Sequence, residues 1–464
     1  MSFALSLLSI EIVGMFFIFL AVRPSRQEYS CLEFVCLSFL VGMAFTSYQL
    51  FLYYVLGIDF NLLNILIVPG ILLLIIFSRY ASKPERLKEF LPAVGYRLKW
   101  DLTKRFLAAG ILVQILWVLF LVIPTPVYSH DAVANYALKA KIFYFLGGVP
   151  EGFFNWSEST VAHPDYPLLL PFLMTWIYAF TGFNDLVVNL VMPVIYLSFL
   201  GLFYSQAKKI FSGAYALLLT FFIATVPQVA DYATVIHADL ILTAVVTGAF
   251  LYFFLYIRNM SKVDLVLSSI LIGSSLWVKN EAIVFAGALL AVFAAFVLRS
   301  GPADKRRLIS GLFLFIIIAA VISAPWLATK ALNHAANSDI DISRMTPDRL
   351  LQNVKDIPVL LNLFQQEVFG PKKWNILWMI LLAAVIWKRK DVWRGENFYT
   401  TLFIILAASG YFAGYMATTG NNLYFYVNTT ISRFMLHFSG LALFLTASLI
   451  YGDVREVPSF KEGS

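Results

Sequence analysis

Long apolar runs alternate with short polar stretches along the whole chain. Many of these runs approach the ~20 residues that a helix needs to cross a hydrocarbon core of about 30 Å. The strands of a membrane barrel would instead alternate apolar and polar positions. The pattern predicts an all-α polytopic membrane protein with about 13 spans, at residues 2–22, 33–56, 61–79, 106–127, 184–206, 210–228, 240–257, 263–279, 282–298, 308–328, 374–388, 398–418 and 431–451.

One further apolar run, residues 168–180, covers only about 13 residues, and a run that short is more often interfacial or re-entrant than spanning. Lysine and arginine decide between these readings, because they concentrate in cytoplasmic loops. If the run does not cross, 24 of the 34 Lys and Arg residues lie inside; if it crosses, 18 do. The sequence therefore predicts a segment that does not cross, an outer N-terminus and a cytoplasmic C-terminus.

Composition agrees with a membrane protein. Hydrophobic residues make up 60% of the chain and charged residues 13%, whereas a soluble protein carries about 25% charged residues. The net charge of +7 is explained mostly by basic loops such as 79–105, so it does not indicate nucleic-acid binding. Cys31 and Cys36 lie five residues apart on an expected helix and face different directions, so neither a disulfide nor a metal site is implied.

Two segments are expected outside the membrane. The first is the outer loop 128–184, and the second, 331–373, carries a helix start at Thr346-Pro347-Asp348 and an end at Gly370-Pro371. We expect three parts in the chain. These are residues 1–105, with three N-terminal spans and a basic cytoplasmic loop; residues 106–330, with the outer loop 128–184; and residues 331–464, with the outer loop 331–373 and the C-terminal spans.

The first outer segment begins with an amphipathic stretch at residues 132–146. Val133, Tyr136 and Phe143 fall on one helical face, while Asn135 and Lys139 fall on another. This pattern predicts an interfacial helix on the outer leaflet, which holds the preceding Asp131 at headgroup height. Asp131 could alternatively serve only as the N-cap of that helix.

With this orientation, the polar residues near the helix ends gather on the outer face. The candidates are Asp131, the HPDYP residues His163, Asp165 and Tyr166, then His237 and Asp239 of an outer turn, Lys279 and Glu281 of a polar break, and Arg433 at the last span. Acidic and basic side chains at the height of the lipid headgroups are suited to a reaction at a lipid phosphate. The cations neutralise the phosphate, while a carboxylate takes a proton from an acceptor.

Several of these candidates could instead have a purely structural role. His163 and His237 fit hydrogen-bonded interface residues better than metal ligands, because no His-x₃-His or cysteine pair accompanies them. Lys279 and Glu281 could simply pair with each other, and Arg433 could snorkel to the lipid boundary. The intramembrane Glu11 should face a partner that the sequence does not identify.

The ordered set resembles a known group of membrane enzymes. An acid just outside a span is followed by an interfacial helix, by "HPDYPLLLP", by a second outer-turn acid in "HADLILTAVV" and by a lysine in "WVKNEAIVF". This order resembles the GT-C superfamily of glycosyltransferases. Its most similar branch is that of the dolichyl-phosphate-mannose protein mannosyltransferases (glycosyltransferase family 39-like), which includes the bacterial aminoarabinose transferases of lipid A. The resemblance covers roughly residues 106–440 and leaves out the three N-terminal spans.

The resemblance implies an inverting glycosyltransferase that moves a sugar from a polyprenyl-phosphate donor to a lipid, glycan or protein acceptor at the outer face. By position, Asp131 and Asp239 match the family's acids of the first and second outer loops and are the expected catalytic residues. Lys279 and Arg433 match its phosphate-binding cations. The expected location is a bacterial inner membrane, with the active site on the periplasmic face. The expected partners are the lipid-linked donor, the acceptor and membrane lipids, without nucleic acid.

Three departures from the family pattern stand out. Asp131 has His130 and Ala132 as neighbours instead of a second acid, which puts a metal role in doubt; the sequence calls for no cofactor and gives no support for a divalent metal. Many relatives have Lys-Pro-Pro where this chain has His163-Pro164-Asp165. That lysine contact is therefore absent, or it is supplied by Lys139 or Lys279. Ser432 stands where an acid is expected.

Two other classes of protein stay open as alternatives. A transporter or flippase of lipid-linked sugars should have broken helices in two symmetric halves and polar groups at mid-membrane. The polar groups here gather at one face, which favours the transferase. A polysaccharide polymerase or ligase that uses diphosphate-linked donors should have one dominant outer loop rich in arginine, whereas the second outer segment has only Arg344 and Arg349.

Overall fold

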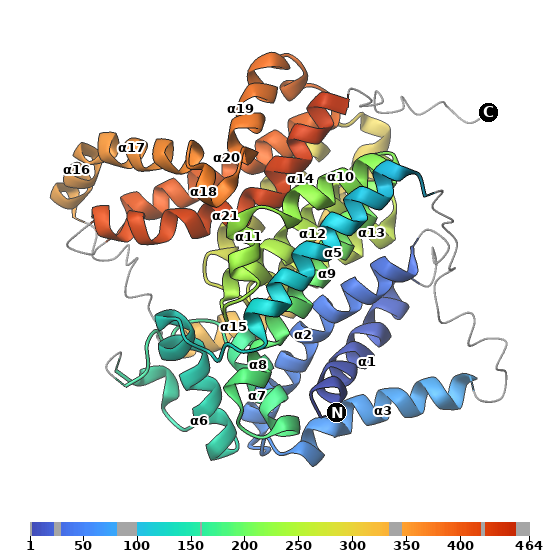
Figure 1. Cartoon of the computed structure of the whole chain (residues 1–464), viewed down its shortest axis with the longest axis vertical. Helices are drawn as coiled ribbons and strands as arrows, with labels where there is room; N and C mark the ends of the chain where they lie inside the picture. Colours follow the sequence, from blue (N-terminus) through green and yellow to red (C-terminus); the bar gives the residue numbers. More distant parts are fainter. Residues whose placement is uncertain are drawn as a thin grey trace.

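The computed structural model describes residues 2–22, 29–80, 100–157, 160–333, 346–418 and 423–451. Its secondary structure is helical (Figure 1), as the apolar pattern predicts. The first half holds α1 (Ser2–Val22), α2 (Cys31–Leu56), α3 (Leu62–Tyr80), α5 (Leu102–Val122), η3 (Ala132–Ala137), α6 (Leu138–Leu146), α7 (Leu169–Thr181), α8 (Asp185–Asn189), α9 (Val191–Ile210), α10 (Gly213–Ala224) and α11 (Pro227–Tyr232). The second half holds α12 (Ala238–Asn259), α13 (Lys262–Ser275), α14 (Ala282–Arg299), α15 (Pro302–Leu332), α16 (Pro347–Lys355), α17 (Ile357–Val368), α18 (Pro371–Trp374), α19 (Leu377–Trp387), α20 (Gly395–Met416) and α21 (Leu423–Tyr451).

Nine helical segments of the described chain are long and apolar enough to cross a membrane. They are α1, α2, α5, the α8–α9 pair, α12, α14, α15, α20 and α21. The prediction of an all-α integral membrane protein is therefore confirmed. Other expected spans coincide with shorter apolar helices such as α10 and α19, so the count of about 13 stays a prediction.

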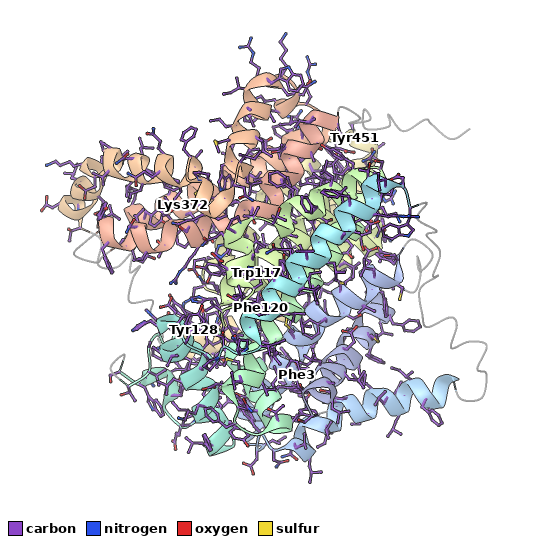
Figure 2. The ribbon with its side chains drawn as sticks, viewed as in Figure 1. Phe3, Trp117, Phe120, Tyr128, Lys372 and Tyr451 are labelled. Atoms are coloured by element: carbon purple, nitrogen blue, oxygen red, sulfur yellow. The ribbon has the colours of Figure 1, made fainter. Side chains whose placement is uncertain are left out.

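Helix α12 lies at the centre, with its apolar window entirely buried. Helix α5 lies at the periphery: Trp117 and Phe120 are exposed and project outward from it (Figure 2). Such aromatic side chains are stable there because the surrounding bilayer is as apolar as they are. The arrangement leaves α12 as the element that carries Asp239 into the interior.

The N-terminal helices belong to the same packed body as the central ones. Helices α1 and α2 cross closely at Gly14 and Gly42; a Cβ atom at Gly14 would lie 1.7 Å from the Ser38 carbonyl oxygen. Helix α2 in turn packs against α7 and α9. On the same helix, Glu33 pairs with Lys209 of α9 at 2.8 Å. The division of the chain at residue 105 stays a prediction, and most of the basic segment 79–105 lies outside the described residues.

The ambiguous apolar run forms α7, which has 13 residues. At 1.5 Å per residue it is about 20 Å long, which is shorter than the ~30 Å core of a bilayer. Its residues from Leu169 to Tyr178 are buried, and it packs against α1, α2 and α6. The length fits a segment that does not cross, while the side of the membrane on which it ends stays a prediction.

The expected helix of the first outer segment is present, but its faces differ from those of a regular α-helix. It begins with the π-helical turn η3, in which the Leu138 amide bonds the Val133 carbonyl five residues earlier. This wider turn shifts side chains relative to α-helical spacing. As a result Val133 is exposed, whereas Asn135 and Lys139 are buried. The prediction that Val133 shares the face of Tyr136 is therefore wrong.

The second outer segment forms α16, α17 and α18, and its first helix begins at Pro347 as predicted. Helix α17 packs along the first part of α21, and α18 packs against α11. Figure 1 shows α16 and α17 extending to the left of the central helices, beside α21. This segment therefore borders the part of α21 that carries Arg433.

Candidate functional site

Four segments that are far apart in the sequence bring their charged residues together. They are the start of η3, the start of α12, the break between α13 and α14, and the first half of α21. Their side chains are Asp131, Asp239, Lys279 and Arg433, which the sequence singled out separately. Asp131 pairs with Arg433 and Asp239 pairs with Lys279.

Asp131 lies in the first turn of its helix, but it does not cap that helix. Its backbone is helical (φ −64°, ψ −36°) and its side chain makes no capping bond. Ser129 caps instead, since its Oγ accepts a hydrogen bond from the Ala132 amide at 3.3 Å. The alternative that Asp131 serves only as an N-cap is therefore wrong. The free carboxylate reaches Arg433, with Oδ2 2.5 Å from Nη2.

The Asp131–Arg433 pair is partly open, with side chains that are 36% and 28% exposed. Burial alone would raise the pKa of Asp131, but the Arg433 charge outweighs it and holds that pKa below its usual value. His237 and His130 act in the same direction. Asp131 is therefore ionised at neutral pH. Arg433 forms an ion pair here, so snorkelling is not its whole role.

Asp239 lies in the first turn of α12 and is fully buried. Its Oδ1 accepts a hydrogen bond from the Lys279 ammonium at 3.0 Å and lies 3.2 Å from His437 Nε2. His237 Nδ1 is 3.4 Å from the other oxygen, Oδ2, without the geometry of a hydrogen bond. A buried carboxylate is costly unless it is paired and hydrogen-bonded. Lys279 and His437 supply those contacts.

Helix α21 contributes two functional side chains from one face. Arg433 and His437 are four residues apart, so they lie one helical turn apart. His437 is fully buried, and its Nδ1 lies 2.7 Å from the Tyr411 hydroxyl of α20. His437 is the site residue that sequence reasoning missed. The four-residue spacing from Arg433 was the available signal, hidden inside an otherwise apolar run.

Lys279, Asn280 and Glu281 form the predicted polar break between α13 and α14. Lys279 is buried and pairs with Glu281 at 3.2 Å as well as with Asp239. The pairing considered for Lys279 and Glu281 is thus present, but it is only part of the network. The Asn280 side-chain amide donates to Asp165 Oδ2 at 3.1 Å. The break therefore connects Asp239 to the HPDYP turn.

The HPDYP turn forms a second polar group. The Lys139 ammonium is buried under it and donates to the His163 carbonyl and to Asn135 Oδ1, both at 2.6 Å. His163 has a φ of +49°, and its ring stacks on Tyr166 with centroids 4.5 Å apart. Burial lowers the pKa of Lys139 to about 7 and raises that of Asp165. The structure thus places three predicted residues, His163, Asp165 and Tyr166, beside the first group.

His237 lies between the two catalytic candidates. Its Nε2 is 3.4 Å from Ser129 Oγ, near the start of η3, and its Nδ1 faces Asp239. The rings of Tyr136 and Tyr232 pack around it at 6.1 and 5.4 Å. This packing fixes the imidazole between Ser129 and Asp239. Glu11, by contrast, lies on α1, and its buried Oε1 has no hydrogen-bond partner among the described residues.

Within the described ranges, the side chains of His, Cys, Asp and Glu form no group of three that could hold a metal ion. The position beside Asp239 where a cation would bind is taken by the Lys279 ammonium, 3.0 Å away. The ammonium already supplies positive charge to that carboxylate. The residues present around Asp239 therefore do not fit a metal site.

Residues 165–328 match the family model described as dolichyl-phosphate-mannose-protein mannosyltransferase. That range includes Asp165, Asp239 and Lys279, while Asp131 and Arg433 lie outside it. A solved structure of the Archaeoglobus fulgidus oligosaccharyltransferase, tethered to an acceptor peptide with the NVT sequon, is similar with a TM-score of 0.44 and 12% identity. The similarity covers 75% of this chain and 49% of that one, so the chain aligns with about half of that enzyme. No curated protein matches the chain.

The helices of the described chain are those of a polytopic membrane protein, and about a third of the chain is similar to a family of membrane mannosyltransferases.

Proposed function

We propose that this protein is an inverting glycosyltransferase that moves a sugar from a polyprenyl-phosphate donor to a lipid, glycan or protein acceptor. We place the reaction at the outer face of the membrane, on the periplasmic side of a bacterial inner membrane. The observation that supports it most is the Asp131–Arg433 pair. It combines an ionised, partly exposed carboxylate with a cation that can bind phosphate.

Asp131 is the proposed general base. It takes the proton from an acceptor hydroxyl while that oxygen forms a bond to the anomeric carbon of the sugar. The bond between that carbon and the phosphate oxygen breaks on the opposite side, so the configuration inverts. The phosphate departs on its polyprenyl chain with the electron pair, and the proton stays on Asp131. No further reactant is required.

Arg433 couples the protonation of the base, Asp131, to the binding of the donor. A donor phosphate and the Asp131 carboxylate are both strong acceptors for the same guanidinium, so they compete for it. When the phosphate binds Arg433, Asp131 loses its partner, and its affinity for a proton rises. The base is thus activated when the donor is in place.

Asp239 is the proposed supporting acid, held ionised by Lys279 and His437. It acts on the base through His237, which lies between it and Ser129. Lys279 is buried between two carboxylates, so we give it the role of fixing Asp239. To bind a phosphate, Lys279 would have to break its ion pair with one of these two carboxylates. Glu281 completes this arrangement by pairing with Lys279.

The balance of charge favours a donor with one phosphate. Each acid of the two polar groups has a cation nearby, so a bound phosphate must displace one of these acids from its cation, and the additional negative charge of a diphosphate would have to displace a second acid. A phosphodiester-linked sugar carries one negative charge, which Arg433 can match. This balance counts against the polymerase or ligase alternative. The acids of these two groups are Asp131, Asp165, Asp239 and Glu281, and their cations are Lys139, Lys279, Lys330 and Arg433.

The proposal is tested with purified protein and two sets of lipid donors that carry the same sugars, one on polyprenyl phosphate and one on polyprenyl diphosphate. Mass spectrometry of glycolipids from cells with and without the protein identifies the sugar to use. We expect transfer from the monophosphate donor only, with an inverted anomeric centre in the product by NMR. A retained configuration, use of the diphosphate donor only, or movement of the lipid across the bilayer without transfer would refute it.

A further inference from the structure

A cavity of about 580 Å³ lies where the N-terminal helices meet the first outer segment. The loop between α2 and α3, the end of α6 and the end of α7 form its walls, toward the bottom of Figure 1. This volume is within the range of about 300–1,000 Å³ that small-molecule pockets have. We call it the α3–α6 cavity, and its lining includes Asp59, Asn61, Leu62, Tyr144, Phe145 and Ala179.

Hydrogen bonds hold the walls of the α3–α6 cavity in place. The Phe60 amide donates to the Gly147 carbonyl at 2.7 Å, which joins the loop before α3 to the end of α6. The Asn64 side chain donates to the Asp59 carbonyl at 2.9 Å, and the Asn64 backbone amide donates to Asn61 Oδ1 at 3.0 Å. The cavity is therefore formed before a ligand enters it, which lowers the entropic cost of binding.

The polar groups of this wall suit a ligand with several hydroxyl groups. Asp59 is exposed, and its carboxylate forms no ion pair with a described residue, so its oxygens are available as acceptors. The Asn61 side chain uses Oδ1 to bond Asn64 and retains two N–H donors. Tyr144 adds a hydroxyl that both donates and accepts. A sugar ring carries several hydroxyls that do both, so it matches this mixed set of groups.

Aromatic rings and charge narrow the class of ligand further. Phe145 is 62% exposed, and with Tyr144 it supplies aromatic surface to the wall. Such rings pack well against the apolar C–H face of a sugar. Asp59 gives the lining a negative charge, while its other residues are uncharged. An anion such as phosphate is therefore repelled, and the cavity fits a neutral or amino sugar.

The distance from the proposed base determines how long the ligand must be. Tyr144 is 13 positions beyond Asp131 on the η3–α6 helix, which corresponds to about 20 Å at 1.5 Å per residue. Val133, Lys141 and Phe145 are exposed along this stretch. A single sugar cannot reach from the cavity to Asp131, whereas a glycan of several sugars can.

We propose that the α3–α6 cavity binds a non-reacting neutral or amino sugar of the acceptor, and that the acceptor is a glycan of several sugars. The proposal rests on the proposed function, and it selects one acceptor class among lipid, glycan and protein. It also gives the N-terminal helices a role in substrate binding. Their loop contributes Asp59 and Asn61 to the cavity, although it lies outside the residues 165–328 that match the family model.

Binding is measured apart from the reaction, by saturation-transfer NMR on the protein in nanodiscs. The probes are pentasaccharides of glucose, mannose, galactose, N-acetylglucosamine or glucosamine, and the pentasaccharide of galacturonic acid is the anionic probe. We expect a neutral or amino probe to bind and the anionic probe not to bind. Loss of a charge-assisted hydrogen bond in Asp59→Ala should weaken binding about tenfold. Loss of the aromatic ring in Phe145→Ala should weaken it several-fold.

Glu151→Ala and Phe369→Ala are the matched controls, because they remove an exposed acid and an exposed phenylalanine of the two outer segments, away from the cavity. Binding of none of the neutral and amino probes, or equal binding by the variants and their controls, would overturn the proposal. A bound phosphatidylethanolamine would also overturn it, if native mass spectrometry shows its loss in Asp59→Ala and no saccharide binds. The cavity would then hold a lipid headgroup.

Turnover distinguishes failure of this proposal from failure of the proposed function. With the pentasaccharide that binds as acceptor, Asp59→Ala should raise the acceptor KM about tenfold and leave the donor KM unchanged. With the methyl glycoside of a single sugar, which does not reach the cavity, the variant should equal wild type. If transfer occurs and the acceptor KM of Asp59→Ala equals that of Glu151→Ala, only the cavity proposal is wrong. If wild-type protein uses no polyprenyl-phosphate sugar, the proposed function is wrong, whatever the NMR shows for the cavity.

Discussion

Replacing Asp131 by Asn is the most direct test of the proposed chemistry. The carboxamide keeps the shape of the side chain and can accept a hydrogen bond, but it cannot accept the acceptor's proton. General-base catalysis typically contributes about 10²–10⁴-fold. We therefore expect kcat to fall by that factor, which corresponds to about 2.7–5.4 kcal/mol of activation free energy.

The same change should alter stability far less. The Asp131 and Arg433 side chains are 36% and 28% exposed, and ion pairs with access to solvent contribute about 0–1 kcal/mol. No helix cap is lost, because Ser129 and not Asp131 makes the capping bond. The expected loss of activity thus exceeds any effect on folding.

The assay compares kcat at saturating donor and acceptor with thermal unfolding in detergent. Ser129→Ala is the matched control, since it removes the cap and should cost about 1 kcal/mol of stability while the carboxylate remains. We expect its kcat to stay within tenfold of wild type. A fully active Asp131→Asn variant would eliminate Asp131 as the base and make Asp239 the next candidate.

Three further predictions concern topology, the buried network and pH. A cysteine at His130 should react with an impermeant label added from outside, while one at Lys305 should not; the reverse pattern would refute the orientation. His437→Ala should lower the free energy of unfolding by about 1–3 kcal/mol, because the buried carboxylate of Asp239 loses a partner; an unchanged melting temperature would contradict this. Since the pKa of Lys139 is lowered to about 7 in the folded protein and is about 10.4 when unfolded, its contribution to stability should grow as pH rises through this range. Melting curves between pH 7 and 9.5 should show that dependence weakened in Lys139→Met.

The helices could be predicted because their signal is local. A membrane helix needs ~20 apolar residues in a row, and α12, expected at 240–257, is observed at Ala238–Asn259. The break at residues 279–281 could be read in the same way, from three polar residues between two apolar runs. The helix start at Pro347 followed from capping preferences.

The pairing of the site residues could not be predicted, because it depends on packing between distant segments. Arg433 and Asp131 are 302 positions apart and meet only when α21 lies beside the start of η3. In the sequence, His437 stands inside an apolar run, and nothing there marked it as a site residue. The π-helical turn was also hidden, since it changes which residues share a face without changing composition.

Arg433 also leads to a prediction about the pH dependence of the reaction. In the free enzyme it holds the pKa of Asp131 below its usual value, so the base stays ionised until the pH falls well into the acid range. Once a donor phosphate binds the guanidinium, Asp131 loses that charge and gains a negative neighbour. Both changes raise its pKa.

Because kcat/KM reports the free enzyme and kcat reports the substrate complex, the acid limb of kcat should lie at higher pH than that of kcat/KM for the donor. In Arg433→Gln the two limbs should converge, since the free enzyme no longer has the cation. Coincident limbs in the wild-type protein would show that Arg433 stays with Asp131 throughout the reaction. The donor phosphate would then have to bind a different cation.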